Sequence, residues 1–255
     1  MKLKTLSIKD DITLYNFAPG DISRIQYIVI HYFGGLPTAK EISAYFRTSR
    51  DNTSAHYCVD EQKIVYRCVQ DKDIAWHCGT KNAYMHPDCR NANSIGIEAR
   101  PSILDTKYKN DAGYAGWYFT KAVEDNVVEL TRALMREYDI PVERVLRHYD
   151  ITGKRCPRPW VGGDTNLYYK TSGDYQWSIF KERLVEEEVT QADFDKMMNV
   201  WLASRNALPG NTWEGFPEAW AKAKSKGVFD GTSPQGFITR GQVAVVLDRL
   251  GVMGK

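Results

Sequence analysis

Two periodicities of apolar residues alternate along most of the chain. Residues 25–33 ("IQYIVIHYF") and 93–99 ("NSIGIEA") are short runs rich in β-branched and aromatic residues, which predict buried strands. In residues 119–138 apolar side chains recur every three or four positions, which predicts a long amphipathic helix. Because strands and helices alternate, we expect an α/β fold in which a central mixed β-sheet is flanked by helices.

Further segments fit the same architecture. In residues 36–49, Thr38 stands three residues before Glu41, which is a helix N-cap pattern. "SAHYCVD" and "KIVYRCV" predict a hairpin that turns around Glu61 and Gln62. "VERVLRHYD" predicts a strand that ends at His148, and "GDYQWSIFKERLVEEE" predicts another helix.

The pattern changes near residues 186–190. "EEEVT" is charged and has no core periodicity, so we place a linker there. We therefore expect two domains. Residues 1–186 form the larger one, which is long enough to carry a catalytic site, and residues 187–255 form a small, mainly helical C-terminal domain. The tail is too small to bury a large core alone, and one of its helices is expected from about Thr239 to Leu250.

Composition and charge exclude some classes of function. The 255 residues are 43% hydrophobic and 26% charged, which is typical of globular proteins, and the net charge of +2 argues against a strong nucleic-acid binder. No run of 18 apolar residues predicts membrane insertion, and the N-terminus lacks the apolar segment of a signal peptide, so we expect synthesis in the cytosol.

The five cysteines form no CxxC pattern. In the reducing cytosol we expect them to be mostly thiols, with Cys58 and Cys68 buried in strands. Cys78 and Cys89 are compatible with a bridge formed after release from the cell, and the sequence leaves this open.

Candidate chemistry gathers in "HYDITGKRC", from His148 to Cys156. His31 and His148 stand at the C-terminal ends of predicted strands, where α/β sheets often bind ligands. Together with Cys156 they offer two imidazoles and a thiolate, a set that suits zinc better than magnesium or calcium. The spacing is also compatible with hydrogen-bonded structural histidines and no metal.

Two more residues have the chemistry that metal-assisted amide cleavage needs. Glu98 lies in an otherwise apolar strand, where a carboxylate is costly unless it has a partner or a proton-transfer role. Lys154 stands two residues before Cys156 and offers a cation for a developing oxyanion. The alternatives are a Glu98 that points to solvent at a sheet edge and a Lys154 that is a solvated loop residue.

Five motifs occur along the chain in the order in which one known protein family has them: "IVIHYFGG", "SAHYCVD", "WHCG", "NANSIGIEA" and "HYDITGKRCPRPW". Over roughly residues 20–180 the chain resembles the zinc-dependent type-2 N-acetylmuramoyl-L-alanine amidases, which are related to the peptidoglycan recognition proteins. The resemblance implies a Zn²⁺ cofactor and hydrolysis of the amide bond between N-acetylmuramic acid and L-alanine in peptidoglycan. It implies His31, His148 and Cys156 as zinc ligands, Lys154 as the oxyanion partner and Glu98 as the general base.

The resemblance also implies a substrate groove. The residues expected along it are His56, Trp76, His77 and Asn93. His56 occupies a position where other members carry a tyrosine near the metal, so its role stays open. Two alternatives to the amidase are a non-catalytic peptidoglycan-binding protein and a zinc peptidase that cuts within the stem peptide. The full ligand set, with Cys156, favours an enzyme.

Residues 219–251 resemble a single S-layer-homology-like unit. This implies binding of a secondary cell-wall polymer by the C-terminal domain. With no signal peptide, the chain is expected to be a phage endolysin of a Gram-positive host, held in the host cytoplasm until lysis and then active on the cell wall. A bacterial autolysin or a prophage-derived amidase is the alternative.

Overall fold

The computed structural model describes residues 1–48, 51–111, 113–185, 191–206, 216–227 and 247. The chain divides into two units, Met1–Glu186 and Glu187–Lys255. Residues 186–190, where the linker is predicted, lie outside the described residues. Within the described part of the chain, no helix has the length and apolar character needed to cross a lipid bilayer.

A six-stranded mixed sheet forms the centre of the first unit, in the order β1-β5-β4-β7-β3-β10. Strands β4, β7, β3 and β10 run parallel to one another, and β5 pairs antiparallel with β4 in the hairpin that the sequence predicts. The mixed sheet is confirmed. Its strands are β1 (Ser7–Asp10), β3 (Tyr27–Tyr32), β4 (Tyr57–Val59), β5 (Ile64–Arg67), β7 (Ser94–Ala99) and β10 (Val145–Arg147).

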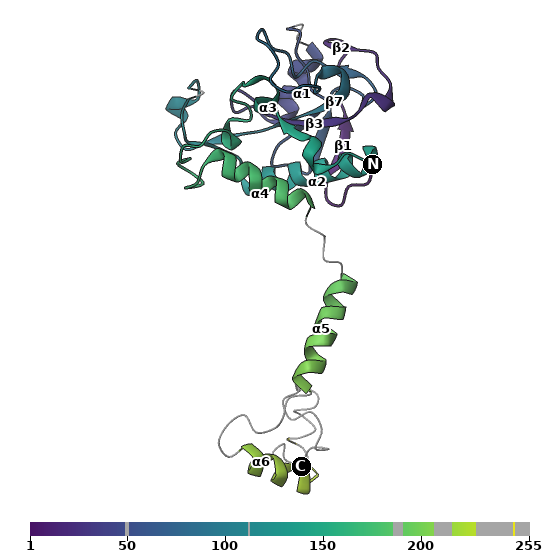
Figure 1. Ribbon diagram of the computed structural model, residues 1–255, viewed down its shortest axis with the longest axis vertical. Coiled ribbons are helices and arrows are strands. Elements are labelled where there is room, and N and C mark those ends of the chain that lie inside the picture. Colours follow the sequence, from purple (N-terminus) through teal and green to yellow (C-terminus); the bar gives the residue numbers. More distant parts are fainter. Residues whose placement is uncertain (49–50, 112, 186–190, 207–215, 228–246, 248–255) are drawn as a thin grey trace. The chain divides into compact units, whose positions relative to one another are not determined.

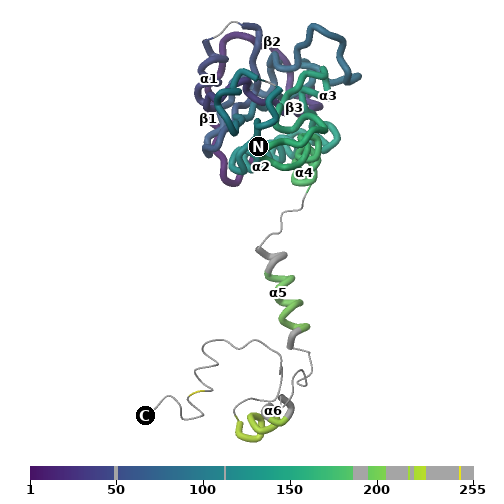
Figure 2. The backbone as a smooth tube through the Cα atoms, turned by 90° about the vertical axis from the view of Figure 1, so that its left-hand side faces the viewer, coloured from purple at the N-terminus to yellow at the C-terminus, as the bar shows by residue number. Residues whose placement is uncertain are grey.

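Helices cover both faces of this sheet (Figure 1). The long helix α2 (Lys121–Tyr138) and α4 (Gly173–Val185) pack together on one face, and Figure 2 shows the same pairing from the side. Helix α1 (Ala39–Thr48) contacts β4 and β5, and the short helix α3 (His148–Thr152) contacts β3 and β10. The smaller elements are β2 (Phe17–Ala18) with β6 (Ile74–Ala75), β8 (Ser102–Ile103) with β9 (Trp117–Tyr118), and the 3-10 turns η1 (Ile22–Arg24), η2 (Asn91–Asn93), η3 (Thr106–Tyr108), η4 (Val142–Arg144) and η5 (Arg158–Trp160).

The face towards α2 holds the largest apolar core. Alternate residues of β3 and β7 point into it, and all are fully buried: Ile28, Ile30, Ile95 and Ile97. Helix α2 contributes its apolar face, and its first turn is capped by the Thr120 hydroxyl, which accepts from the Val123 N–H. Burial of each of these aliphatic side chains stabilises the fold by about 1.5–3 kcal/mol. This face therefore anchors β3 and β7.

The opposite face has smaller apolar clusters. Cys58 and Cys68 pack with Phe46 of α1, and Val29 packs with Cys78, Cys89 and Ile151 of α3. All five cysteines are buried free thiols. The burial predicted for Cys58 and Cys68 is confirmed, and Cys78 and Cys89 are not bridged in this structure.

The second unit contains α5 (Gln191–Asn206) and α6 (Phe216–Ser225). The predicted helix from about Thr239 to Leu250, and with it most of the S-layer-homology-like stretch, falls outside the described residues.

Candidate metal centre

His31 and Glu98 lie side by side in the middle of the sheet. They are direct register partners on the parallel strands β3 and β7. Since side chains two residues apart share a face, both lie on the side opposite the α2 core. The alternative in which Glu98 points to solvent at a sheet edge is wrong, because β7 is enclosed between β4 and β3.

His148 reaches the same place from the neighbouring strand. The strand predicted to end at His148 ends at Arg147, and His148 begins helix α3. The first five residues of the stretch from His148 to Cys156 are thus helical. The Asp150 carboxylate fixes this start, because it accepts the Arg147 N–H at 2.8 Å and pairs with the Arg147 guanidinium at 2.8 Å.

Cys156 returns to the start of α3 through a tight reversal. Gly153 ends the helix with φ of +75°, a conformation that favours glycine, and its N–H donates to the Tyr149 carbonyl. The Tyr149 N–H then donates to the Cys156 carbonyl at 2.8 Å. As a result, Cys156 Sγ lies 3.7 Å from His31 Nδ1, and the ring centres of His31 and His148 lie 4.8 Å apart.

The three predicted ligands form a set that fits a metal ion. One ligand atom from each of His31, His148 and Cys156 lies within 4.8 Å of the others, and all three side chains are buried. Neither ring nitrogen of His148 has a hydrogen-bond partner among the described residues, although both are buried. Buried polar atoms without partners are costly, and a metal ion would satisfy them. Two imidazoles and a thiol suit zinc.

Burial also keeps both imidazoles in the form that binds metal. It lowers the pKa of His148 to about 4, assisted by the positive charge of Lys154. Burial also lowers the pKa of His31 well below its usual value, with smaller contributions from His148, His77 and Lys154. Both rings are therefore neutral at pH 7, as metal ligation requires.

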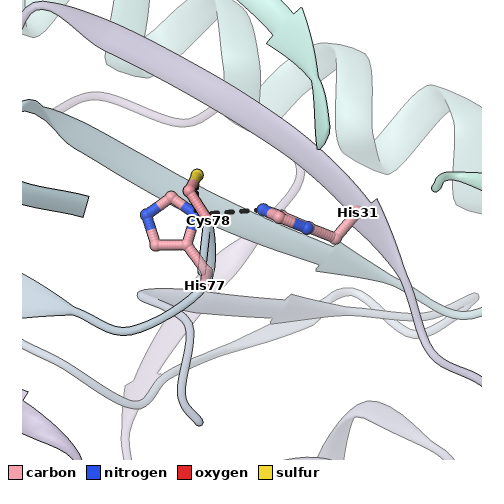
Figure 3. A group of neighbouring side chains, drawn as sticks. All are labelled: His31, His77 and Cys78. Atoms are coloured by element: carbon pink, nitrogen blue, oxygen red, sulfur yellow. Dashed lines mark hydrogen bonds between the residues drawn. The ribbon is translucent and has the colours of Figure 1, made fainter. Parts of the chain in front are cut away.

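A second group of possible ligands shares His31. His77 and Cys78, from the loop after β6, lie beside His31 (Figure 3), with His77 at Nε2 of the ring and Cys156 at Nδ1. In this group, however, the nitrogens of His77 have partners: Nδ1 lies 3.0 Å from His31 Nε2, and Nε2 lies 3.2 Å from Ser94 Oγ. The unpartnered nitrogens of His148 therefore favour the set with Cys156.

Glu98 and Lys154 differ in exposure, and the charge of Lys154 influences the pKa of Glu98, His31 and His148. The Glu98 Oε2 atom is buried and has no hydrogen-bond partner in the described residues. Burial raises the pKa of Glu98 to about 7, and the charge of Lys154 opposes this rise. The Lys154 side chain is exposed, yet its charge also lowers the pKa of His31 and His148. It is therefore a surface lysine whose charge is felt by the buried groups of the site.

The expectation that His56 lines the groove is wrong. Its side chain is fully buried, its Nδ1 accepts the Gly96 N–H at 3.0 Å, and its Nε2 lies 3.1 Å from the Asp73 carbonyl. Because Nδ1 accepts the Gly96 N–H, the single proton of the neutral ring lies on Nε2, where the Asp73 carbonyl accepts it, although the Arg24 guanidinium also lies 2.9 Å from that nitrogen. Burial, followed by the nearby Arg24 charge, lowers the pKa of His56 to about 3. His56 is a neutral structural residue that links β7 to the preceding loops.

The other three expected groove residues have different surroundings. Trp76 is half-buried, and its backbone N–H donates to Ser54 Oγ. Asn93 closes its own turn, since its Oδ1 accepts the Arg90 N–H and its Nδ2 donates to the Asp88 carbonyl. His77 is only 7% exposed, and its ring faces His31, which does not agree with a groove-lining role.

Sequence reasoning missed two residues that position His77. Asn91 Oδ1 accepts the N–H groups of both His77 and Cys78, at 3.0 and 2.6 Å. Gly96 leaves room for the ring, because a Cβ there would lie 2.6 Å from His77 Cγ. The alternation Ser94, Gly96, Glu98 in "NSIGIEA" was an available signal: small residues precede the carboxylate on one face of the strand.

The sequence also matches a known protein family. A family described as N-acetylmuramoyl-L-alanine amidase matches residues 21–159, which is more than half of the chain. N-acetylmuramoyl-L-alanine amidase CwlL of Bacillus licheniformis is 29% identical over 157 residues, which cover 57% of this chain and 39% of that protein. N-acetylmuramoyl-L-alanine amidase CwlA of Bacillus subtilis (strain 168) is 26% identical over 149 residues, which cover 58% of this chain and 49% of that protein.

Solved structures share the fold. The catalytic domain of XlyA matches with a TM-score of 0.51 at 24% identity, over 70% of this chain and 99% of that one. The structure of PlyL matches with a TM-score of 0.52 at 23% identity, over 72% of this chain and 100% of that one. The chain thus spans less than two thirds of the length of these curated relatives, but 99% and 100% of the two solved chains.

Proposed function

Since this chain belongs to the N-acetylmuramoyl-L-alanine amidase family, we propose that it hydrolyses the amide bond between N-acetylmuramic acid and L-alanine in peptidoglycan, with one zinc ion held by His31, His148 and Cys156. The observation that carries the proposal is the set of buried groups without partners. The two His148 nitrogens and Glu98 Oε2 have none among the described residues, and they belong to one cluster with His31 and Cys156.

The residues around the cluster have distinct roles in this proposal. Zinc bound by the three ligands supplies Lewis acidity to the scissile carbonyl and to water. Glu98 takes the proton of the attacking water and returns it to the leaving nitrogen of L-alanine, so that one carboxyl serves as base and then as acid. Lys154 stabilises the negative charge that develops on the carbonyl oxygen.

Burial fits Glu98 to both roles. A carboxyl whose pKa is raised to about 7 gains and loses a proton with little cost near neutral pH. Lys154 has the opposite requirement, because it must stay charged while the substrate is bound. Its side chain is exposed to solvent, which favours the charged form.

Mass spectrometry of digested cell walls tests the proposal. We expect the full chain to release intact stem peptides that begin with a free L-alanine amino group. New amino groups inside the stem peptide would instead identify a peptidase. Binding to walls without any released peptide would identify a non-catalytic peptidoglycan-binding protein. Glu98→Gln serves as the matched control, since it keeps the shape of the side chain and removes the base.

For residues 187–255 we propose binding of a secondary cell-wall polymer, on the resemblance of residues 219–251 to an S-layer-homology unit. The full chain should then sediment with intact walls more strongly than with walls from which these polymers have been extracted. Equal sedimentation would contradict this. Action as a phage endolysin of a Gram-positive host stays a prediction from the sequence.

A further inference from the structure

A chain of hydrogen bonds runs behind His31, on the side away from Cys156. The Ser94 Oγ lies 2.6 Å from the Arg90 carbonyl oxygen, and His77 Nε2 lies 3.2 Å from Ser94 Oγ. His77 Nδ1 lies 3.0 Å from His31 Nε2. All three side chains are buried: Ser94 is 0%, His31 2% and His77 7% exposed. Figure 3 shows the last of these bonds, between the rings of His77 and His31.

The chemistry of the first bond fixes the direction of the others. A carbonyl oxygen only accepts, so the single hydroxyl proton of Ser94 points at Arg90. Ser94 Oγ can then only accept from His77, which places the His77 proton on Nε2. A neutral imidazole has one N–H, so His77 Nδ1 is a bare acceptor. The proton in the bond to His31 must therefore come from His31 Nε2.

The Cys78 thiol is a competing donor, because its Sγ also lies 3.0 Å from His77 Nδ1. Nδ1 has one lone pair, so it accepts either from the thiol or from His31 Nε2. The thiol has a second partner in Cys89, since burial and then the hydrogen bond with Cys89 raise the pKa of Cys78. With the thiol proton directed to Cys89, Nδ1 accepts from His31. The backbone holds the arrangement in place, because Asn91 fixes the His77 and Cys78 N–H groups and Gly96 leaves room for the His77 ring.

We infer that Ser94 and His77 are positioning residues that hold His31 with its proton on Nε2, so that the lone pair of Nδ1 faces the metal. His31 Nδ1 is the nitrogen that lies 3.7 Å from Cys156 Sγ. Metal-bound histidines commonly donate their second N–H to a carboxylate, carbonyl or water. Here His77 is the acceptor for the second N–H of His31, and Ser94 links His77 to the Arg90 carbonyl. The inference rests on the proposed zinc site for its purpose, but the tautomer can be measured without zinc.

The direct test is ¹⁵N NMR of the histidine side chains in the full chain, labelled on histidine, without and with zinc. We expect the metal-free protein to show the proton on Nε2 of both His31 and His77. The zinc-loaded protein should keep the Nε2 proton of His31 and shift its Nδ1 resonance. A proton on Nδ1 of either residue in the metal-free chain would overturn the inference.

Two amide substitutions give a matched pair for the functional consequence. The Asn amide oxygen of His77→Asn can occupy the place of Nδ1 and still accept from His31. The longer side chain of His77→Gln reaches the place of Nε2 and leaves His31 without its acceptor. We expect His77→Gln to weaken zinc binding about 10- to 100-fold and His77→Asn to restore most of that loss. Cys78→Ala controls for local packing and should bind zinc as the wild type does.

Competition with a chromophoric chelator measures these affinities. Equal zinc affinity of His77→Gln and the wild type would overturn the inference, as would equal losses in the Gln and Asn variants. A wild-type chain that binds no zinc would contradict the proposed function instead. In that case the tautomer of His31 alone would decide whether the hydrogen bonds run as inferred.

Discussion

The two faces of β3 and β7 are built from alternate residues of the same strands, yet they differ in almost every physical respect. One face presents Ile30 and Ile97, both fully buried against a helix-covered apolar core. The other presents His31 and Glu98, which belong to a centre where buried polar atoms have no partner among the residues described. The first face lowers the free energy of the fold, and the second raises it unless a ligand is bound.

This difference has a consequence for mutations. A side chain on the apolar face is needed for stability and has no contact with the chemistry. The His31 and Glu98 side chains on the other face are needed for the chemistry and contribute little to stability, because the loss of their hydration is not offset by hydrogen bonds within the protein. Two substitutions at neighbouring residues of one strand should therefore differ in the property they change. One lowers stability and leaves activity nearly unchanged, and the other lowers activity and leaves stability nearly unchanged.

The largest effect is expected at the metal ligands. Cys156→Ser keeps the size of the side chain and removes the thiolate, so zinc binding and hydrolysis should be lost together. We expect activity on cell walls to fall by at least about 10³-fold, since the metal supplies several kcal/mol of transition-state stabilisation. The urea midpoint of the metal-free protein should change little. A variant with more than a tenth of wild-type activity would contradict the assignment of Cys156.

Glu98→Gln should lose turnover and keep the metal. A general base of this kind contributes about 10²- to 10⁴-fold to the rate. Release of free L-alanine termini measures turnover, and elemental analysis measures zinc. The matched control is Glu143→Gln, which removes one carboxylate from the exposed turn η4. If both variants were equally active, Glu98 would not be the base.

Ile97→Ala tests the opposite face, one residue from Glu98. Truncation of a fully buried isoleucine should lower the free energy of unfolding by about 2–5 kcal/mol. The kcat/KM of the folded variant, measured well below its melting temperature, should stay within about twofold of the wild type. A large loss of kcat/KM with unchanged stability would break the distinction between the two faces.

A further effect concerns pH, and it is absent at neutral pH. The pKa of His56 is about 3 in the folded chain and about 6.5 when unfolded, so between these values the unfolded chain binds more protons. Stability should therefore fall as the pH drops from 6.5 towards 3. His56→Gln should reduce the slope by about 1.4 kcal/mol per pH unit in this window, because one proton is involved. Urea unfolding of the metal-free chain at pH 4–6.5 measures it, and an unchanged slope would contradict the neutral, buried state of His56.

The sequence predicted the parts of this structure that periodicity controls. The strands around Ile28 and Ile95, the hairpin at Glu61 and the helix from Lys121 follow from apolar spacing. The convergence of His31 and His148 followed from their positions at strand ends.

Periodicity carried no information about hydrogen-bond partners. Nothing in the spacing showed that His56 would bond to Gly96 and Asp73, or that His77 would face His31, because those partners come from loops distant in sequence. The helical start at His148 depends on the Arg147–Asp150 pair, a local contact that outweighed the strand pattern.

Zinc content of the purified full chain tests the central claim most directly, which is that the polar face binds one metal ion through His31, His148 and Cys156. We predict about one zinc per chain in the wild type and in Cys78→Ala, and none in His148→Ala. A His148→Ala variant that keeps its zinc, together with a Cys78→Ala variant that loses it, would place the metal at His31, His77 and Cys78 and contradict this account.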